Sequence, residues 1–221
     1  MKLFIDTGNF ADIKRFQHVI DGITTNPTLI AKENYDLSFD SYIEEISKIF
    51  SGPISIEVIN TQVDLIVEEA KKIVKIAPHA VIKVPMNSDG LIAVRKLSSL
   101  GIQTNVTLIF SQNQALLAAK AGATYASIFV GRLDDIGEEG VQVVRNARLM
   151  FDLYQFPTQI IFASTRHPKH VSEAALAGSH AITIPPQILE KLFFHPLTDQ
   201  GLAQFLDDWN KRTMSIQSVK K

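Results

Sequence analysis

The chain has 221 residues, of which 46% are hydrophobic and 20% are charged, and its formal net charge is -1. This composition supports a substantial buried core and excludes an intrinsically disordered chain, and the even spread of Lys and Arg argues against nucleic-acid binding as a main role. The sequence has no cysteine, which excludes disulfides and thiolate metal sites and fits a reducing compartment. No apolar run is long enough to span a bilayer and the first residues lack the pattern of a signal peptide, so we expect a cytoplasmic protein without a membrane partner.

Short β-prone runs alternate with helix-patterned segments along the whole chain. Most of the runs are apolar throughout, as expected of parallel strands that are buried on both faces. Eight of them are predicted as strands: Leu3–Asp6, Gly22–Thr24, Ile54–Val58, Val81–Val84, Ile102–Asn105, Tyr125–Phe129, Gln159–Ala163 and Ala181–Ile184.

The segments between these strands carry helix start and stop signals. Ser111 and Gln114 fit a capping box, and Gly122 supplies a left-handed stop. Pro168 and Pro186 suit the first helical positions of two later helices. Alternating strands and helices of this kind predict a single α/β domain over residues 1–221, folded as a (β/α)8 TIM barrel. An open doubly wound sheet is the alternative, but no glycine fingerprint follows the first strand.

An additional C-terminal helix is predicted over about 197–213. Leu202, Phe205, Leu206 and Trp209 form one apolar stripe along it. The stripe suits packing either on the chain's own barrel or on a neighbouring subunit, and the sequence does not separate the two. We expect residues 218–221 to fray.

Polar side chains stand at the C-terminal ends of most predicted strands, where the active site of a (β/α)8 barrel lies. They are Asp6, Asn26, Glu57, Lys83, Asn105, Thr107, Ser127, Arg132, Ser164 and Arg166. Each has a plain structural explanation: Asp6 could cap a helix, Asn26 could form an Asx turn, and Glu57 could merely neutralise Lys83. Their convergence on one barrel mouth favours a catalytic role.

Lys83 is the most informative of these residues because it lies inside the apolar run Val81-Ile82-Lys83-Val84-Pro85. A poorly solvated lysine favours its neutral amine, which attacks carbonyl carbons. Addition to a ketone and loss of water give a protonated Schiff base, an electron sink that allows a nearby carbon–carbon bond to break. Glu57 with Thr107 suits the water shuttling, and Asp6 suits removal of the hydroxyl proton.

A phosphorylated sugar fits the remaining side chains. Arg132, Ser164 and Arg166 suit a phosphate group, and Asn26 and Asn105 suit sugar hydroxyls.

The sequence resembles the transaldolase family, especially its small members, which include the fructose-6-phosphate aldolases. The matching segments occur in family order over nearly the whole chain. They are Phe4-Ile5-Asp6-Thr7, Gly22-Ile23-Thr24-Thr25-Asn26-Pro27-Thr28, Ile82-Lys83-Val84-Pro85, Asn105-Val106-Thr107-Leu108-Ile109-Phe110-Ser111, Phe129-Val130-Gly131-Arg132-Leu133-Asp134-Asp135, Ala163-Ser164-Thr165-Arg166 and Ile182-Thr183-Ile184-Pro185.

The resemblance implies roles for the polar residues. It implies that Lys83 forms the Schiff base, that Asp6 is the acid–base carboxylate, and that Glu57 with Thr107 holds the catalytic water. It further implies a set that binds substrate: Asn26, Asn105, Ser127, Phe129, Arg132, Ser164 and Arg166. Sugar phosphates are then the substrates, no metal or organic cofactor is required, and the chain forms a homo-oligomer, a pentamer or decamer, in which the C-terminal helix reaches a neighbour.

Two positions indicate which activity of the family to expect. Its aldolase members carry glutamine where this chain has Glu57 and tyrosine where it has Phe129. Phe129 offers no phenol to position water near the enamine, which favours capture of the enamine by a second aldehyde. Both positions point to transaldolase, with fructose-6-phosphate aldolase as the alternative and a non-catalytic sugar-phosphate-binding barrel as an alternative of another class. Ile128, Thr165 and His167 depart from the commonest residues of the family but remove no proposed catalytic group.

His167 and His170 stand at a spacing that suits shared metal ligation on a helix. Because Pro168 lies between them and no supporting Cys or Glu pattern is present, we expect no metal site there.

Overall fold

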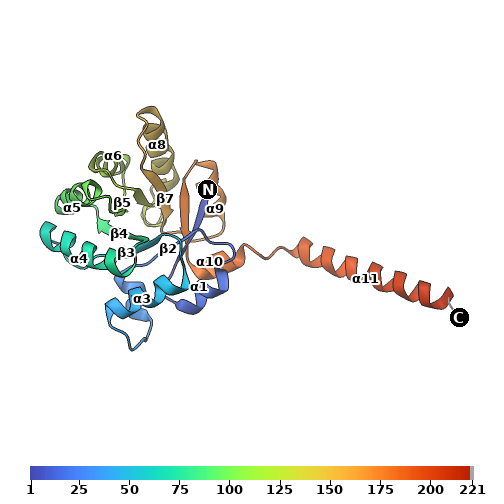
Figure 1. The fold of residues 1–221 in the computed structure, drawn as a ribbon. Coiled ribbons are helices and arrows are strands. Elements are labelled where there is room, and N and C mark those ends of the chain that lie inside the picture. Colours follow the sequence, from blue (N-terminus) through green and yellow to red (C-terminus); the bar gives the residue numbers. More distant parts are fainter. Residues whose placement is uncertain (220–221) are drawn as a thin grey trace.

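The computed structural model describes the backbone of residues 1–219 and the side chains of residues 1–212. Eight parallel strands close into a barrel in sequence order, with helices around it (Figure 1). The strands are β1 (Lys2–Asp6), β2 (Gly22–Thr24), β3 (Ile54–Glu57), β4 (Ala80–Pro85), β5 (Thr104–Ile109), β6 (Tyr125–Phe129), β7 (Gln159–Ala163) and β8 (Ala181–Ile184). The predicted (β/α)8 barrel with an additional C-terminal helix is confirmed.

The helices follow the strands in turn. They are α1 (Phe10–Phe16), α2 (Pro27–Lys32), α3 (Phe39–Ile49), α4 (Val63–Ile76), α5 (Ser88–Ser99), α6 (Gln112–Ala121), α7 (Val130–Asp134), α8 (Gly140–Leu153), α9 (Lys169–Leu176), α10 (Pro186–Lys191) and α11 (Pro196–Val219). In the described part of the chain, no helix combines the length and apolarity needed to cross a membrane.

Local signals explain several helix boundaries. Ser111 Oγ accepts a hydrogen bond from the Gln114 N–H at 3.2 Å, and Gly122 adopts the left-handed conformation with φ 89°. The return bond of the capping box differs slightly from expectation, because Gln114 Oε1 accepts from the N–H of Phe110, one residue earlier than the box requires. Pro186 opens α10 as predicted, whereas Pro168 lies one residue before α9.

The fifth strand begins and ends later than predicted. The N–H of Ile102 donates to Leu97 O at 3.0 Å, closing α5 in a Schellman-type turn with Gly101 at φ 73°. Ile102 therefore belongs to the helix stop and not to the strand. At the other end β5 continues to Ile109 through a register irregularity opposite β6, where Leu108 has φ 61°.

The barrel has two separate apolar cores because side chains alternate along each strand. The larger one lies between the strands and the helices and contains residues such as Ile5, Ile82 and Ile182. The smaller one fills the barrel interior and consists of Phe4, Val81, Tyr125, Ile161 and Ala181. Gly22 leaves room for it, because a Cβ there would lie 2.6 Å from the Phe4 ring.

A polar layer follows the inner apolar core towards the C-terminal ends of the strands. Side chains two residues apart on a strand point to the same face, so the residue two positions after each inner core residue also faces inward. On four strands this residue is polar: Asp6 follows Phe4, Lys83 follows Val81, Ser127 follows Tyr125, and Thr183 follows Ala181. Adjacent strands pair Glu57 with Lys83 and Lys83 with Asn105. The strand register thus assembles the reactive side chains.

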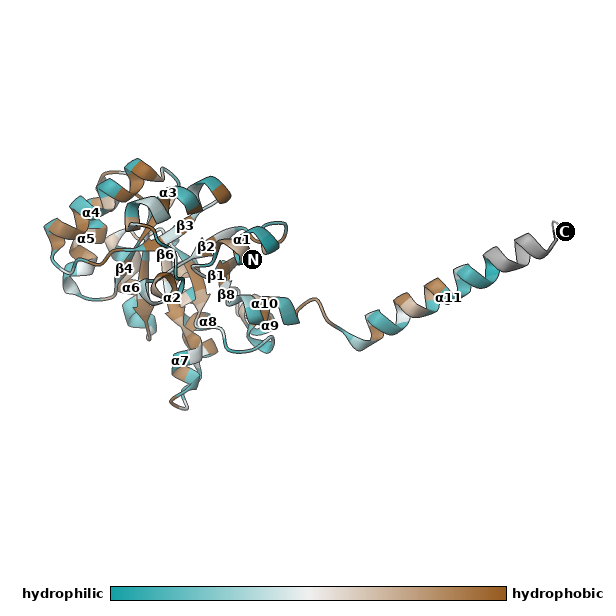
Figure 2. Cartoon of the chain, turned by 90° about the horizontal axis from the view of Figure 1, so that it is seen from below, coloured by the Kyte–Doolittle hydropathy of each residue, from teal (hydrophilic) through white to brown (hydrophobic). Residues whose placement is uncertain are grey.

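Helix α11 extends away from the barrel (Figures 1 and 2). The residues of its apolar stripe are exposed, from 55% for Leu202 to 71% for Phe205. Packing on the chain's own barrel is therefore not the arrangement found. The helix is also longer than predicted and includes residues 218 and 219, which were expected to fray. Residues 220 and 221 lie outside the described part of the chain, so the fraying of these two residues remains a prediction.

Candidate active site

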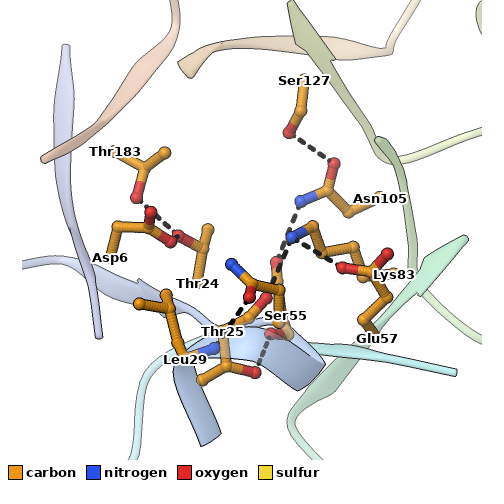
Figure 3. Close-up of polar contacts among 11 residues, drawn as sticks. Asp6, Thr24, Thr25, Leu29, Ser55, Glu57, Lys83, Asn105, Ser127 and Thr183 are labelled. Carbon is orange, nitrogen blue, oxygen red and sulfur yellow. Dashed lines mark hydrogen bonds and ion pairs between the residues drawn. The ribbon is translucent and has the colours of Figure 1, made fainter. Parts of the chain in front are cut away.

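Lys83 lies on the inner face of β4 and is 5% exposed. Its Nζ lies 3.0 Å from Glu57 Oε2 and donates a hydrogen bond to the carbonyl oxygen of Thr25 at 2.9 Å (Figure 3). A buried ammonium is costly without such partners. The amine is consequently held at one point of the barrel wall by groups from β3 and from the end of β2.

A chain of side-chain hydrogen bonds beside this point runs from Ser55 on β3 through Asn105 on β5 to Ser127 on β6. Ser127 Oγ donates to Asn105 Oδ1 at 2.7 Å, and Asn105 Nδ2 donates to Ser55 Oγ at 3.1 Å. Asn105 is fully buried, so both ends of its amide are fixed by protein partners.

Asp6 stands on the other side of the barrel opening from the Lys83 group, beside Thr24 and Thr183 (Figure 3). Thr24 Oγ1 donates to Asp6 Oδ1 at 2.6 Å and also lies 2.6 Å from Thr183 Oγ1. Because Thr24 gives its only hydroxyl proton to Asp6, Thr183 must donate to Thr24. The two threonines therefore form a chain of hydrogen bonds that ends at the Asp6 carboxylate.

Burial raises the pKa of Asp6 above its usual value of 3.8, while the Lys83 ammonium and the Thr24 hydroxyl oppose that rise. The residue keeps some exposure to solvent, yet desolvation remains the strongest influence on its carboxyl group. A carboxyl group with a raised pKa is suited to giving up and recovering a proton.

A cavity of about 180 Å³ opens above these groups at the C-terminal ends of the strands. Its lining includes eight of the eleven predicted site residues: Asp6, Asn26, Lys83, Ser127, Phe129, Arg132, Ser164 and Arg166. Asn26 lines the cavity and also has a structural role, because its Oδ1 caps α2 by accepting a hydrogen bond from the Leu29 N–H at 2.9 Å.

The other three predicted residues, Glu57, Asn105 and Thr107, lie outside that lining. Glu57 and Asn105 contact the site through Lys83 and Ser127, as given above. Thr107 is 1% exposed, and its Oγ1 has no hydrogen-bond partner among the residues that the structure describes. A buried hydroxyl of this kind is a place for a bound water.

The residues predicted to bind phosphate follow the ends of β6 and β7: Arg132, Ser164 and Arg166. The Arg132 guanidinium carbon stands 5.1 Å from the centre of the Phe129 ring, and Arg166 Nη2 donates to Asp135 Oδ2 at 2.7 Å. The chain turns at Ser164 with φ 62°. Gly131 is needed beside this turn, because a Cβ there would lie 1.9 Å from Ser164 O.

Several residues to which the sequence patterns assigned no role also build the site. They are Thr24, Thr25, Ser55, Thr165, Thr183 and Pro185. The two-residue alternation from the inner apolar core would have identified Thr183, because it follows Ala181 on the same face of β8.

A larger hollow of about 620 Å³ lies at the opposite end of the barrel, lined by residues at the starts of strands such as Lys2, Ala80 and Tyr125. Among the described residues, no carboxylate lines this hollow beside Lys2. The smaller cavity is lined by both Lys83 and Asp6 and is therefore the candidate active site.

His167 and His170 do come close, with ring centres 3.8 Å apart. However, within the described residues no three side chains of metal-ligating type gather at one point.

Comparisons with known proteins identify the family of the chain. Residues 3–218 match the sequence model of the Transaldolase/Fructose-6-phosphate aldolase family. A protein of Geobacillus thermodenitrificans (strain NG80-2) named "Probable transaldolase" is 52% identical over 214 residues, covering 96% of this chain and 100% of the relative. Proteins of the same name from Lactiplantibacillus plantarum and Alkaliphilus metalliredigens are each 53% identical over 211 residues, covering 95% of this chain and 96% and 98% of the relatives.

Proposed function

The chain belongs to the transaldolase/fructose-6-phosphate aldolase family, and from that premise we propose that it is a transaldolase. The proposed reaction transfers a dihydroxyacetone unit from a ketose phosphate, sedoheptulose 7-phosphate or fructose 6-phosphate, to an aldose phosphate, glyceraldehyde 3-phosphate or erythrose 4-phosphate. This is a reaction of the pentose phosphate pathway, and we assign it to the cytoplasm. The observation that carries the proposal is the buried Lys83 amine held by Glu57 beside a cavity that also contains Asp6.

The first step is formation of the Schiff base. Glu57 takes a proton from the Lys83 ammonium, 3.0 Å away, and the neutral amine adds to the ketone carbon of the donor. Protonation of the resulting hydroxyl releases water and leaves an iminium ion. The Thr107 hydroxyl, on the strand next to β4, has no hydrogen-bond partner among the described residues and is suited to hold that water.

Bond cleavage follows. Asp6 removes the proton from the hydroxyl on C4 of the donor, the C3–C4 bond breaks, and its electron pair moves towards the iminium nitrogen to give the enamine. The departing fragment is an aldose phosphate. The raised pKa of Asp6 supports both this step and its reverse, in which the protonated carboxyl group returns the proton to the alkoxide formed on the acceptor. The iminium ion is itself the electron sink, so the scheme invokes no metal ion and no organic cofactor.

The remaining lining residues hold the substrate. Arg132, Ser164 and Arg166 bind its phosphate, and Asn26, Asn105 and Ser127 orient hydroxyls near the reacting carbons. Phe129 packs edge-on against Phe110, with ring centres 5.8 Å apart, and presents an apolar ring to the cavity. An apolar wall excludes water from the enamine, so the second aldehyde captures it.

We further propose a homo-oligomer, a pentamer or decamer, in which α11 packs on a neighbouring subunit. The exposed stripe of Leu202, Phe205, Leu206 and Trp209 supports this assignment. An apolar stripe of this size rarely stays in water.

A coupled assay with fructose 6-phosphate tests the proposed activity. We expect turnover that requires erythrose 4-phosphate and yields sedoheptulose 7-phosphate. Rapid release of free dihydroxyacetone without an acceptor would instead identify fructose-6-phosphate aldolase, and binding of sugar phosphates without any turnover would identify a non-catalytic barrel.

A further inference from the structure

His170 is a buried histidine behind the phosphate-binding end of the cavity. It lies near the start of α9, is 2% exposed, and packs edge-on against Phe162 with ring centres 5.3 Å apart. Its Nδ1 accepts a hydrogen bond from the backbone N–H of Arg166 at 3.2 Å, and its Nε2 lies 3.1 Å from Asp134 Oδ2. Both ring nitrogens are therefore engaged.

These two contacts define the tautomer of the ring. A backbone N–H can only donate, so Nδ1 must carry a lone pair, and the single proton of a neutral imidazole lies on Nε2 and is donated to Asp134. Asp134 is itself oriented, because its Oδ1 accepts from the Gly140 N–H at 3.1 Å. A protonated ring would present a second N–H to the Arg166 N–H, and that hydrogen bond would be lost.

The segment that His170 contacts follows a left-handed turn and is held by several hydrogen bonds. The chain leaves β7 through the left-handed turn at Ser164, and Thr165 Oγ1 donates to Thr183 O at 2.8 Å. The next residue, Arg166, is held by the consecutive carboxylates of Asp134 and Asp135 at the end of α7, one at its backbone and the other at its side chain. Asp134 acts on its backbone through His170, and Asp135 accepts directly from its guanidinium group.

We propose that His170 is a positioning residue for phosphate binding, which with Asp134 holds the backbone of Arg166 in place only while its imidazole is neutral. This inference rests on the proposed function in so far as Arg166 binds the substrate phosphate. His170 does not touch the substrate in this account and acts through Arg166.

The surroundings of His170 keep the ring neutral near pH 7. Burial, followed by the neighbouring His167, lowers the pKa of His170 below its usual 6.5, while Asp134 and Glu173 oppose this. The other charged side chains facing this region are Glu138, Glu139, Arg145 and Lys169. Because the pKa is lower in the folded protein, the contribution of His170 to stability is complete above pH 6.5 and is lost as the pH falls through the folded-state pKa. Phosphate affinity should decline over that same acidic range.

Two conservative variants separate the roles of the two ring nitrogens. In His170→Asn the amide oxygen stands as many bonds from the backbone as Nδ1 and can still accept from Arg166. In His170→Gln the amide nitrogen stands as many bonds away as Nε2 and can still donate to Asp134, but nothing replaces Nδ1. Both variants are neutral at every pH used, and their similar polarity makes each the control for the other.

The test measures binding of inorganic phosphate and the kinetics of fructose 6-phosphate turnover in the full-length chain. Loss of one backbone hydrogen bond at a charged site should raise the phosphate Kd and the KM of His170→Gln about five- to tenfold with little change in kcat. His170→Asn should stay within about twofold of the wild type. Acidification from pH 7 towards pH 5 should weaken phosphate binding more in the wild type than in His170→Asn, a comparison in which the titration of phosphate itself cancels.

Equal phosphate affinity in all three proteins, or a wild type that binds no phosphate, would overturn the inference. So would an equal loss in both variants, because that result indicates a packing role alone. A protein that shows the expected order of phosphate affinities but no transaldolase turnover would refute the proposed function and leave the role of His170 standing.

Discussion

The amine of Lys83 and the carboxylate of Glu57 lie 3.0 Å apart on paired positions of two neighbouring strands. This contact lies in the polar layer of the barrel and holds the amine that is proposed to form the Schiff base. In the resting state the carboxylate makes burial of the ammonium tolerable. In the proposed reaction the same carboxylate accepts the proton that the amine must lose.

Asp6→Asn should separate catalysis from stability. Asparagine can still accept from Thr24 but cannot take a proton, so kcat should fall by about 10²- to 10⁴-fold. Burial raises the pKa of Asp6, so its contribution to stability is present below its usual value of 3.8 and is lost as the pH rises through the folded-state pKa. At pH 7 the variant should therefore melt at a higher temperature than the wild type.

Thermal melts of both proteins between pH 7 and pH 4 provide the check. The difference in melting temperature should narrow as the pH falls, because the wild-type carboxyl group becomes neutral. A variant that is less stable at pH 7 would show that attraction to Lys83 outweighs desolvation.

Phe129→Tyr should increase protonation of the enamine and its release as free dihydroxyacetone, at the expense of transfer to an acceptor. A phenol on the wall of the cavity can hold water near the reacting carbon, so release of free dihydroxyacetone from fructose 6-phosphate without an acceptor should rise by about tenfold or more over the wild type. The coupled measurement of free dihydroxyacetone checks this, and Phe156→Tyr, outside the cavity lining, is the matched control. Acceptor-free release that stays at the wild-type rate would show that Phe129 does not govern the fate of the enamine.

Arg166→Ala should weaken the binding of phosphorylated substrates in particular. Loss of a charge-assisted contact should raise KM and lower kcat/KM by about 10- to 100-fold. Arg95→Ala removes a guanidinium group on α5, outside the cavity lining, and should leave these constants unchanged. Equal activity of Arg166→Ala on phosphorylated and unphosphorylated donors, matching the wild type, would contradict a phosphate-binding role.

Removal of α11 should disrupt the assembly. A chain that ends before Leu197 loses the exposed stripe, and light scattering should report a smaller particle than the full-length protein forms. The full-length variant Leu206→Ser/Trp209→Ser tests the same stripe without deletion and should behave alike. If both proteins retain the full-length particle mass, α11 does not maintain an oligomer.

Much of the fold could be predicted because local signals agree with the global arrangement. Four strands, Gly22–Thr24, Tyr125–Phe129, Gln159–Ala163 and Ala181–Ile184, have the predicted bounds. The start of β5 could not be placed because Ile102 is as apolar as a strand residue, and only the hydrogen bond to Leu97 shows that it ends a helix. Much of the candidate site could be predicted because Asp6, Glu57, Lys83 and Thr107 each lie within two residues of the end of a predicted strand.

The supporting residues of the site were harder to predict. Thr183 and Ser55 are ordinary strand residues until the register places them beside Thr24 and Asn105. The hydrogen bond between Arg166 and His170 depends on a turn that no local pattern specifies. The orientation of α11 likewise could not be predicted, because the same apolar stripe suits its own barrel and a second subunit.

Borohydride reduction in the presence of fructose 6-phosphate tests the Schiff base itself. Peptide mass spectrometry of the treated protein should find the reduced adduct on Lys83, and Lys83→Met, which keeps an apolar side chain in the layer, should acquire none while losing turnover. Reduced protein without an adduct, or with the adduct on a different lysine, would contradict the assignment of Lys83 as the nucleophile.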